Sequence, residues 1–128
     1  MIRVGIIGSG NIAKTQHIPA YRSYKDPVEI VAICGRDETR TNNVAHEFQI
    51  PKAYTDLSKM LSENTLDIIS VCSPNNLHYH HVMQSLNAGC HVLCEKPPGL
   101  NYDQAKEMAE KANDKGRMLC YNFCYRQL

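Results

Sequence analysis

The N-terminal segment limits the possible folds of this chain more than any other feature. Residues 2–7 are a short, mostly apolar run with β-branched side chains, and GSGNIA, a GxGxxA motif, follows directly. A strand, a glycine turn and a helix in succession are typical of dinucleotide-binding loops. Gly8 would allow the tight turn, and Gly10 would let a pyrophosphate approach the backbone. The N–H groups of Asn11 and Ile12 would then hold the phosphates at the positive end of the helix. We therefore expect a cofactor-binding loop made of Gly8, Ser9, Gly10, Asn11 and Ile12, the alternative being a plain glycine turn.

The rest of the chain alternates between predicted strands and predicted helices. Five further strands are expected at residues 28–34, 52–55, 66–72, 90–94 and 117–125, with a helix in most intervals between them. Residues 28–34 are apolar almost throughout, as expected of a parallel strand covered on both faces. Right-handed crossovers predict an α/β fold, a doubly wound parallel sheet of the Rossmann type with strand order 3-2-1-4-5-6.

Pro19 interrupts the first predicted helix. Its nitrogen cannot donate to the carbonyl of Thr15, so the helix is expected to kink or divide there. His17 lies beside this break, and we interpret it as a kink-region histidine, with a catalytic role as the alternative. In the last predicted helix, the spacing places Tyr102, Ala105, Met108, Ala109 and Ala112 on one inward face.

Length and charge favour a single domain. The chain has 128 residues, enough for one hydrophobic core. The 14 Lys and Arg against 13 Asp and Glu give a net charge of +1, so neither nucleic acid nor an anionic membrane is indicated as a partner. No apolar run approaches the roughly 20 residues that span a bilayer, and no signal segment precedes the first strand. We expect a cytoplasmic location.

Six cysteines raise the question of a metal site or disulfides. Cys90 and Cys94 are separated by three residues, as are Cys120 and Cys124, whereas common zinc sites use a CxxC spacing. All four fall in predicted strands, where residues four apart share a face. We therefore expect buried small side chains, and neither a metal site nor a disulfide.

The predicted sheet gathers four polar junctions at one edge. In a doubly wound sheet, a ligand lies across the carboxyl ends of the strands where the strand order reverses, here between the first and fourth strands. That rule brings together residues 8–12, 34–37, 73–76 and 95–97. These junctions hold most of the unusual polar sequence of the chain.

The junction after the second strand bears on the type of cofactor. NAD-binding domains place an acidic residue there, which accepts a hydrogen bond from the ribose 2′-hydroxyl. This chain has Cys34-Gly35-Arg36-Asp37 instead. A guanidinium can pair with a 2′-phosphate and stack on adenine, so Gly35 and Arg36 are expected to contact the cofactor, and Arg36 favours NADP(H) over NAD(H). Asp37 could turn back to a ribose or simply cap the following helix.

Lys96 is the candidate catalytic residue of the fourth junction. An ammonium there could hydrogen-bond a substrate oxygen and stabilise the negative charge that grows on it during hydride transfer. The Glu95-Lys96-Pro97-Pro98 sequence restricts the backbone more than a surface loop requires. The alternative is a surface lysine paired with Glu95.

Several motifs together carry a resemblance to a known family. They are GSGNIA at residues 8–13, His17-x-Pro19-Ala20, SPNNLH at residues 73–78 and AGCHVLCEKP at residues 88–97. They resemble signatures of the N-terminal domain of the Gfo/Idh/MocA oxidoreductases, which include glucose-fructose oxidoreductase and inositol dehydrogenase. The last motif resembles the family's AGKHVLCEKP signature nearly residue for residue. The resemblance implies an NAD(P)-binding domain over residues 1–128.

The resemblance also implies roles for individual residues. Lys96 would contact the reacting substrate oxygen, with Glu95, Lys96 and Pro97 beside the nicotinamide. Ser73, Pro74, Asn75 and His78 would line the nicotinamide-side half of the cofactor cleft. Members of the family transfer hydride between a nicotinamide cofactor and a sugar, polyol or related carbonyl compound.

Members of the family carry a second domain that supplies acid/base residues, most of the substrate pocket and the usual oligomer interface. We expect that domain to lie outside this chain, so that residues 1–128 alone bind nucleotide with little turnover. Cys124 occupies the position of a family arginine. Two other functions stay open: a non-catalytic nucleotide-sensing module, and a lyase or glycosidase that uses transient oxidation by NAD.

Overall fold

The computed structural model describes residues 1–122 of the chain. Its elements are β1 (Ile2–Ile7), η1 (Ala13–His17), α1 (Ile18–Ser23), β2 (Val28–Cys34), α2 (Glu38–Glu47), β3 (Lys52–Tyr54), α3 (Leu57–Glu63), β4 (Ile68–Val71), η2 (Asn75–Leu77), α4 (His78–Asn87), β5 (His91–Glu95), α5 (Tyr102–Lys115) and β6 (Leu119–Asn122). This alternation confirms the predicted pattern. The strands β4 and β6 begin two residues later than predicted, and Cys124 lies outside the described residues.

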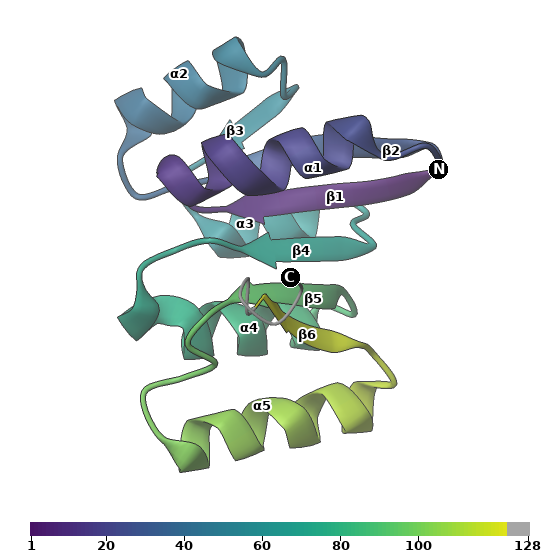
Figure 1. Cartoon of the computed structure of the whole chain (residues 1–128), viewed down its shortest axis with the longest axis vertical. Helices are drawn as coiled ribbons and strands as arrows, with labels where there is room; N and C mark the ends of the chain where they lie inside the picture. The colour runs from purple at the N-terminus through teal and green to yellow at the C-terminus, as the bar shows by residue number, and fades with distance from the viewer. Residues whose placement is uncertain (123–128) are drawn as a thin grey trace.

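The strands form one parallel sheet with the predicted order, β3-β2-β1-β4-β5-β6 (Figure 1). β1 lies near the middle, where Val4 pairs with Ile30 of β2 on one side and with Ile68 of β4 on the other. The strand order reverses between β1 and β4. Every strand therefore ends at the same edge, and the two central carboxyl ends lie side by side.

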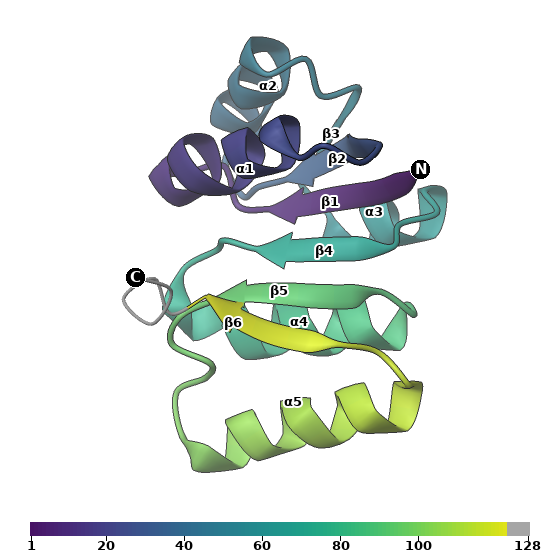
Figure 2. The same ribbon diagram turned by 45° about the vertical axis from the view of Figure 1, so that its right-hand side comes forward.

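Helices cover the two faces of the sheet unequally (Figures 1 and 2). α1 and α2 lie over β1, β2 and β3 on one face, whereas α3, α4 and α5 lie on the opposite face. On the α1 side, no described helix lies over β4, β5 and β6. Each covered region has its own core: Val4, Ile6, Ile18, Ile33 and Val44 on the α1 side, and Ile69, Val71, Leu86, Val92 and Met108 on the other.

The first helix is continuous from residue 11 to residue 23 but changes type along its length. Residues 13–17 form the π-helical turn η1, in which the amide of Ile18 donates to the carbonyl of Ala13. Pro19 lies in the first turn of α1, where its missing N–H is tolerated. The predicted division at Pro19 is therefore a change of helix type, and the wider turn carries His17 to a buried position.

Polar side chains cap the starts of two later helices. Asp56 Oδ1 accepts from the amide of Ser58 at the start of α3, and Asn101 Oδ1 accepts from the amide of Gln104 at the start of α5. Gly116 ends α5 with a left-handed conformation, at φ 62°. These contacts satisfy backbone groups that a helix leaves free at its ends.

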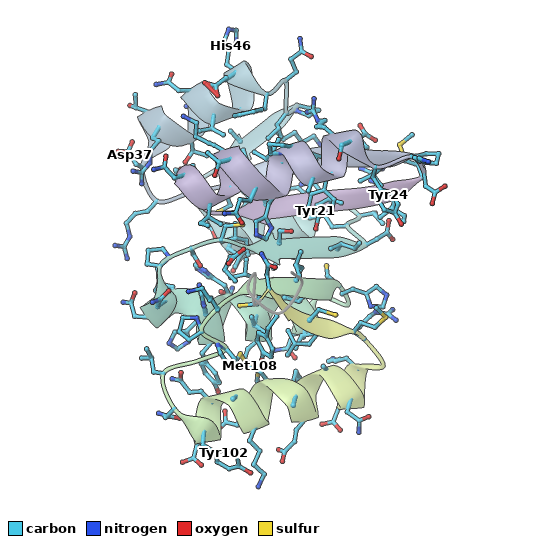
Figure 3. All side chains as sticks on the ribbon, viewed as in Figure 1. Tyr21, Tyr24, Asp37, His46, Tyr102 and Met108 are labelled. Carbon is cyan, nitrogen blue, oxygen red and sulfur yellow. The ribbon has the colours of Figure 1, made fainter. Side chains whose placement is uncertain are left out.

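Two predictions about burial were partly wrong. On α5, Met108 points toward the sheet and is buried, whereas Tyr102 points away and is exposed, as Figure 3 shows. Tyr102 is the first residue of the helix, and Ala109 is also exposed, so the inward face is narrower than its spacing suggested. Cys90 and Cys94 are buried as predicted, but Cys120 is exposed because no described helix covers its side of β6.

The described cysteines are all free thiols. Among residues 1–122, no cluster of three or more His, Cys, Asp or Glu side chains is arranged to hold a metal ion. Within the same range, no helix is both long and apolar enough to cross a membrane.

Candidate functional site

The structure gathers the four predicted junctions at the carboxyl edge of the sheet. The glycine loop contacts the end of β2, because the amide of Gly8 donates to the carbonyl of Cys34 at 2.7 Å. The junctions after β4 and β5 are joined through His78, and Glu95 at the end of β5 returns to the glycine-loop helix through His17. These contacts link the four junctions in series, from the end of β2 through the glycine loop and the end of β5 to the end of β4.

Gly8 and Gly10 serve different purposes in the glycine loop. Gly8 has φ +107°, and a Cβ there would lie 2.6 Å from the carbonyl oxygen of Cys72, so no larger residue fits. A Cβ on Gly10 would meet nothing within 4 Å. Gly10 precedes the helix, which starts at residue 11, and has no side chain that could cap it. The loop thus leaves open space beside a helix N-terminus, which is an arrangement suited to an anionic group.

Ser9 and Gly35 bind the glycine loop to the start of α2. Ser9 is buried, and the hydroxyl of Thr41 donates to Ser9 Oγ at 3.1 Å. A Cβ on Gly35 would lie 2.2 Å from Thr41 Oγ1. The Ser9 side chain therefore packs inside the protein, which leaves only its backbone to contact a ligand.

Arg36 and Asp37 follow Gly35, and only the side chain of Asp37 is engaged in a helix cap. Asp37 caps α2, because its Oδ1 accepts from the amide of Arg40 at 3.0 Å. Of the two predicted alternatives for Asp37, the structure therefore shows the helix cap. Arg36 is exposed, and its positive charge acts on His81 across the site.

His81 is a residue of the site that the sequence analysis missed. Its Nδ1 lies 2.7 Å from Ser73 Oγ, in the junction after β4. Burial, followed by the charges of His78, His80 and Arg36, lowers the pKa of His81 from 6.5 to about 4. The spacing of three between His78 and His81, which puts both on one side of α4, is the signal that could have indicated it. Pro74 and Asn75 of the same junction are exposed.

His78 joins the junction after β4 to the loop after β5. Its side chain is fully buried, with Nδ1 2.8 Å from the carbonyl oxygen of Pro97 and Nε2 2.8 Å from that of Ser73. Carbonyl oxygens only accept, so the neutral ring donates to one of them and the protonated ring to both. In this structure His78 holds two loops together and presents no open surface.

Glu95 at the end of β5 forms a second buried link. His17 Nε2 donates to Glu95 Oε1 at 2.5 Å, and Asn122 Nδ2 donates to the same oxygen at 2.8 Å. Burial raises the pKa of Glu95, but the hydrogen bonds from Asn122 and His17, with the charge of His17 and the backbone amide of Lys96, outweigh it and hold that pKa below 4.5. His17 does lie at a change in the helix, and its contact with Glu95, which neither of its two interpretations included, makes it part of the site.

Lys96 lies between these two links. It is exposed, and its ammonium makes no ion pair with any residue of the described range. The Glu95 carboxylate, its expected partner in the surface-lysine alternative, is turned to His17 and Asn122. The Lys96–Pro97 peptide bond is cis. The structure therefore presents a free ammonium at the carboxyl edge of the sheet.

A cavity of about 400 Å³ lies beside the His17–Glu95 pair on the α1 face of the sheet. Tyr21 and Tyr24, both labelled in Figure 3, contribute to it from α1 and the residue that follows. Tyr21 is tied to β4 by a 2.6 Å contact between its hydroxyl and Ser70 Oγ. The cavity is lined by Gln16, His17, Ala20, Tyr21, Tyr24, Leu93 and Asn122.

Comparisons with known proteins agree with this geometry. Residues 2–123 match the model of the GFO_IDH_MocA family, described as an oxidoreductase family with an NAD-binding Rossmann fold. The D-glucoside 3-dehydrogenase of Escherichia coli K12 is 39% identical over 98% of this chain and 35% of its own length. The D-xylose 1-dehydrogenase (NADP(+)) 2 of Haloferax volcanii is 36% identical over 95% of this chain and 37% of its own length.

A solved structure shows the same fold. A 3-ketoreductase from Actinomadura kijaniata, crystallised with TDP-benzene and NADP, superposes with a TM-score of 0.90 at 30% identity. The superposition covers 99% of this chain and 40% of that structure. The chain thus spans about a third of the length of the curated relatives it matches.

Proposed function

We propose that this chain is the cofactor-binding part of an enzyme that transfers hydride to or from a sugar or polyol. The chain belongs to the Gfo/Idh/MocA oxidoreductase family and forms its NAD-binding Rossmann domain. One observation carries the proposal. The open backbone at Gly10 and the ammonium of Lys96, which has no ion pair within residues 1–122, lie on two junctions that the His17–Glu95 contact links. The open backbone at Gly10 can receive a phosphate, and the Lys96 ammonium can bind a substrate oxygen that becomes charged.

The residues present fit a dinucleotide. The space beside Gly10, at the start of the helix, would receive the pyrophosphate on backbone amides of Ser9, Asn11 and Ile12. Gly8 and Gly35 would let the loop and the end of β2 approach closely. We assign the nicotinamide half to the junction after β4 and the loop after β5, made of Ser73, Pro74, Asn75, His78, Glu95 and Lys96.

We also propose that NADP(H) is preferred to NAD(H). Arg36 is exposed at the end of β2, whereas the adjacent carboxylate of Asp37 is committed to the start of α2. A free guanidinium beside an occupied carboxylate suits a 2′-phosphate better than a 2′-hydroxyl. The name of the H. volcanii relative specifies NADP(+), and the A. kijaniata ketoreductase was crystallised with NADP.

Lys96 is the proposed catalytic residue. The nicotinamide, when bound, supplies or accepts the hydride. The ammonium of Lys96 would hydrogen-bond the substrate oxygen and stabilise the charge that develops there. The proton acceptor for a substrate hydroxyl and most of the substrate pocket would come from a second domain, as would a homo-oligomer interface. A free lysine at this position favours catalysis over a purely sensing role, because a sensor has no oxygen to stabilise.

Calorimetric titration of the chain with NADP⁺ and NAD⁺ tests the cofactor assignment. We expect NADP⁺ to bind more tightly, and Arg36→Ala to weaken NADP⁺ binding by about tenfold while leaving NAD⁺ binding nearly unchanged. Arg40→Ala, which removes the same charge from an exposed position on α2, is the matched control. Equal affinities for the two nucleotides in the wild type would contradict the preference for NADP(H).

A further inference from the structure

Lys96 lies between two residues that buried histidines hold in place. Glu95, which precedes it, contacts His17, and the carbonyl of Pro97, which follows it, contacts His78. We propose that His17 and His78 are positioning residues that set the loop on which Lys96 is presented to the nicotinamide end of a bound cofactor. The ligand in this proposal rests on the proposed function, whereas the restraint on the loop concerns this chain alone.

The first restraint joins the Lys96 loop to the glycine-loop helix. The His17 side chain is 3% exposed and comes from η1, one turn after the glycine motif. Its Nε2 lies 2.5 Å from Glu95 Oε1, and Asn122 of β6 holds the same oxygen. The carboxylate that directly precedes Lys96 is therefore held by residues from two distant elements.

The second restraint acts one residue after Lys96. His78, the first residue of α4, has no exposed surface. Its two nitrogens each lie 2.8 Å from a carbonyl oxygen, that of Pro97 in the Lys96 loop and that of Ser73 after β4. Because the ring is buried, losing either contact would leave an unsatisfied carbonyl or nitrogen. His78 thus sets the distance between the two junctions assigned to the nicotinamide.

The two restraints leave the ammonium free while they fix the backbone that carries it. No helix or strand runs through residues 96–101, so regular structure does not hold this loop. A flexible loop would have to be ordered each time a ligand binds, which weakens binding. Anchors on both sides of Lys96 remove that requirement in advance. A purely structural histidine would affect the stability of the chain but not the contribution of the nicotinamide to binding.

Amide hydrogen exchange on the chain without ligand tests the restraint itself. We expect the peptide segment at residues 95–100 to exchange about threefold faster or more in His17→Leu and in His78→Leu than in the wild type. His17→Gln, which places an amide nitrogen near the former Nε2, should keep slow exchange. His46→Asn is the matched control, because His46 lies on α2 and points away from the site (Figure 3).

Two ligands measure the effect on the nicotinamide end. NADP⁺ and 2′-phospho-ADP-ribose share every group except the nicotinamide. The Kd of 2′-phospho-ADP-ribose divided by the Kd of NADP⁺ therefore reports the contribution of that ring. We expect this ratio to shrink by about fivefold in His17→Leu and in His78→Gln, while affinity for 2′-phospho-ADP-ribose stays within about twofold. His78→Asn keeps a donor near the Nδ1 position toward Pro97, so it should retain the wild-type ratio, as His46→Asn should.

The outcomes separate the two proposals. An unchanged ratio in folded His17→Leu and His78→Gln would overturn the positioning roles and leave the proposed function intact. If the wild type binds neither NADP⁺ nor NAD⁺, the proposed function fails and the exchange experiment decides the restraint. If His78→Leu does not fold, the comparison of His78→Asn with His78→Gln decides the role of His78, because equal ratios in those two variants would contradict it.

Discussion

The two sides of the candidate site are built from different parts of the chain. On the glycine-loop side, the candidate site is formed by backbone groups. Gly8 makes the tight turn, Gly10 leaves open space for a ligand, and the start of the helix provides free backbone amides. On the Lys96 side, side chains hold the loop, through His78 and through the His17–Glu95 pair. A backbone-built site depends on whether a Cβ fits, whereas a side-chain-built site depends on buried hydrogen bonds. The two sides should therefore respond differently to substitution.

The largest effect is expected at Gly8. Gly8→Ala places a Cβ 2.6 Å from the carbonyl oxygen of Cys72, on a backbone with φ +107°. Backbone must move to make room, so we expect a loss of about 3 kcal/mol or more in the free energy of unfolding. Urea denaturation followed by circular dichroism measures the loss.

Gly116→Ala is the control for the backbone conformation alone. Gly116 also has a positive φ, of 62°, but a Cβ there meets nothing within 4 Å. Its replacement should reduce the free energy of unfolding by only about 1 kcal/mol. Equal losses at the two glycines would show that contact with Cys72 is not what requires a glycine at position 8.

A smaller effect is expected from Glu95→Ala on the Lys96 side. The change leaves His17 buried without its acceptor, so the free energy of unfolding should fall by about 2 kcal/mol at pH 7. The pKa of Glu95 is below 4.5 in the folded state, so its contribution to stability is present above pH 4.5 and is lost as the pH falls through the folded-state pKa. The difference between wild type and variant should therefore narrow on acidification.

Denaturation at pH 7 and pH 3 measures this narrowing. Glu47→Ala, which removes an exposed carboxylate from α2, should change the free energy of unfolding by less than about 0.5 kcal/mol at both pH values. A constant difference between wild type and Glu95→Ala over this range would contradict a charge-dependent link.

The smallest effect concerns His81. Its pKa is about 4 in the folded state against 6.5 as its ordinary value, so the folded state favours the neutral ring. The stabilisation is present above pH 6.5 and is lost as the pH falls toward 4. Because the ring is partly exposed, we expect a loss of about 1 kcal/mol from this residue. Thermal unfolding between pH 7 and pH 4 should show a shallower decline in His81→Asn, whereas parallel declines would argue against the role of His81.

The sequence was sufficient to predict the sheet order and the tight turn at Gly8. The strand order follows from the apolar runs and from right-handed crossovers. The turn at Gly8 follows from the residues next to it in the sequence. Both predictions therefore depend on short stretches of sequence. The cap formed by Asp37 was one of two open alternatives, since a carboxylate at that position can serve either purpose.

The side-chain links around Lys96 could not be predicted in the same way. His17 and Glu95 are 78 positions apart in the sequence, and Asn122 is 27 positions beyond Glu95. His17 lies in the π-helical turn η1, and Pro19 indicated a break in this helix but not a π-helical turn. His78 was selected by resemblance, but its two backbone partners became clear only from the folded arrangement.

The affinity of Gly10→Val for NADP⁺ tests the central claim most directly. A Cβ at position 10 meets nothing within 4 Å, so the variant should unfold within about 2 °C of the wild type. The added side chain fills the space assigned to the pyrophosphate, so calorimetry should show at least about tenfold weaker NADP⁺ binding. Unchanged affinity in the folded variant would mean that the glycine loop is only a turn and that a dinucleotide, if bound, lies elsewhere.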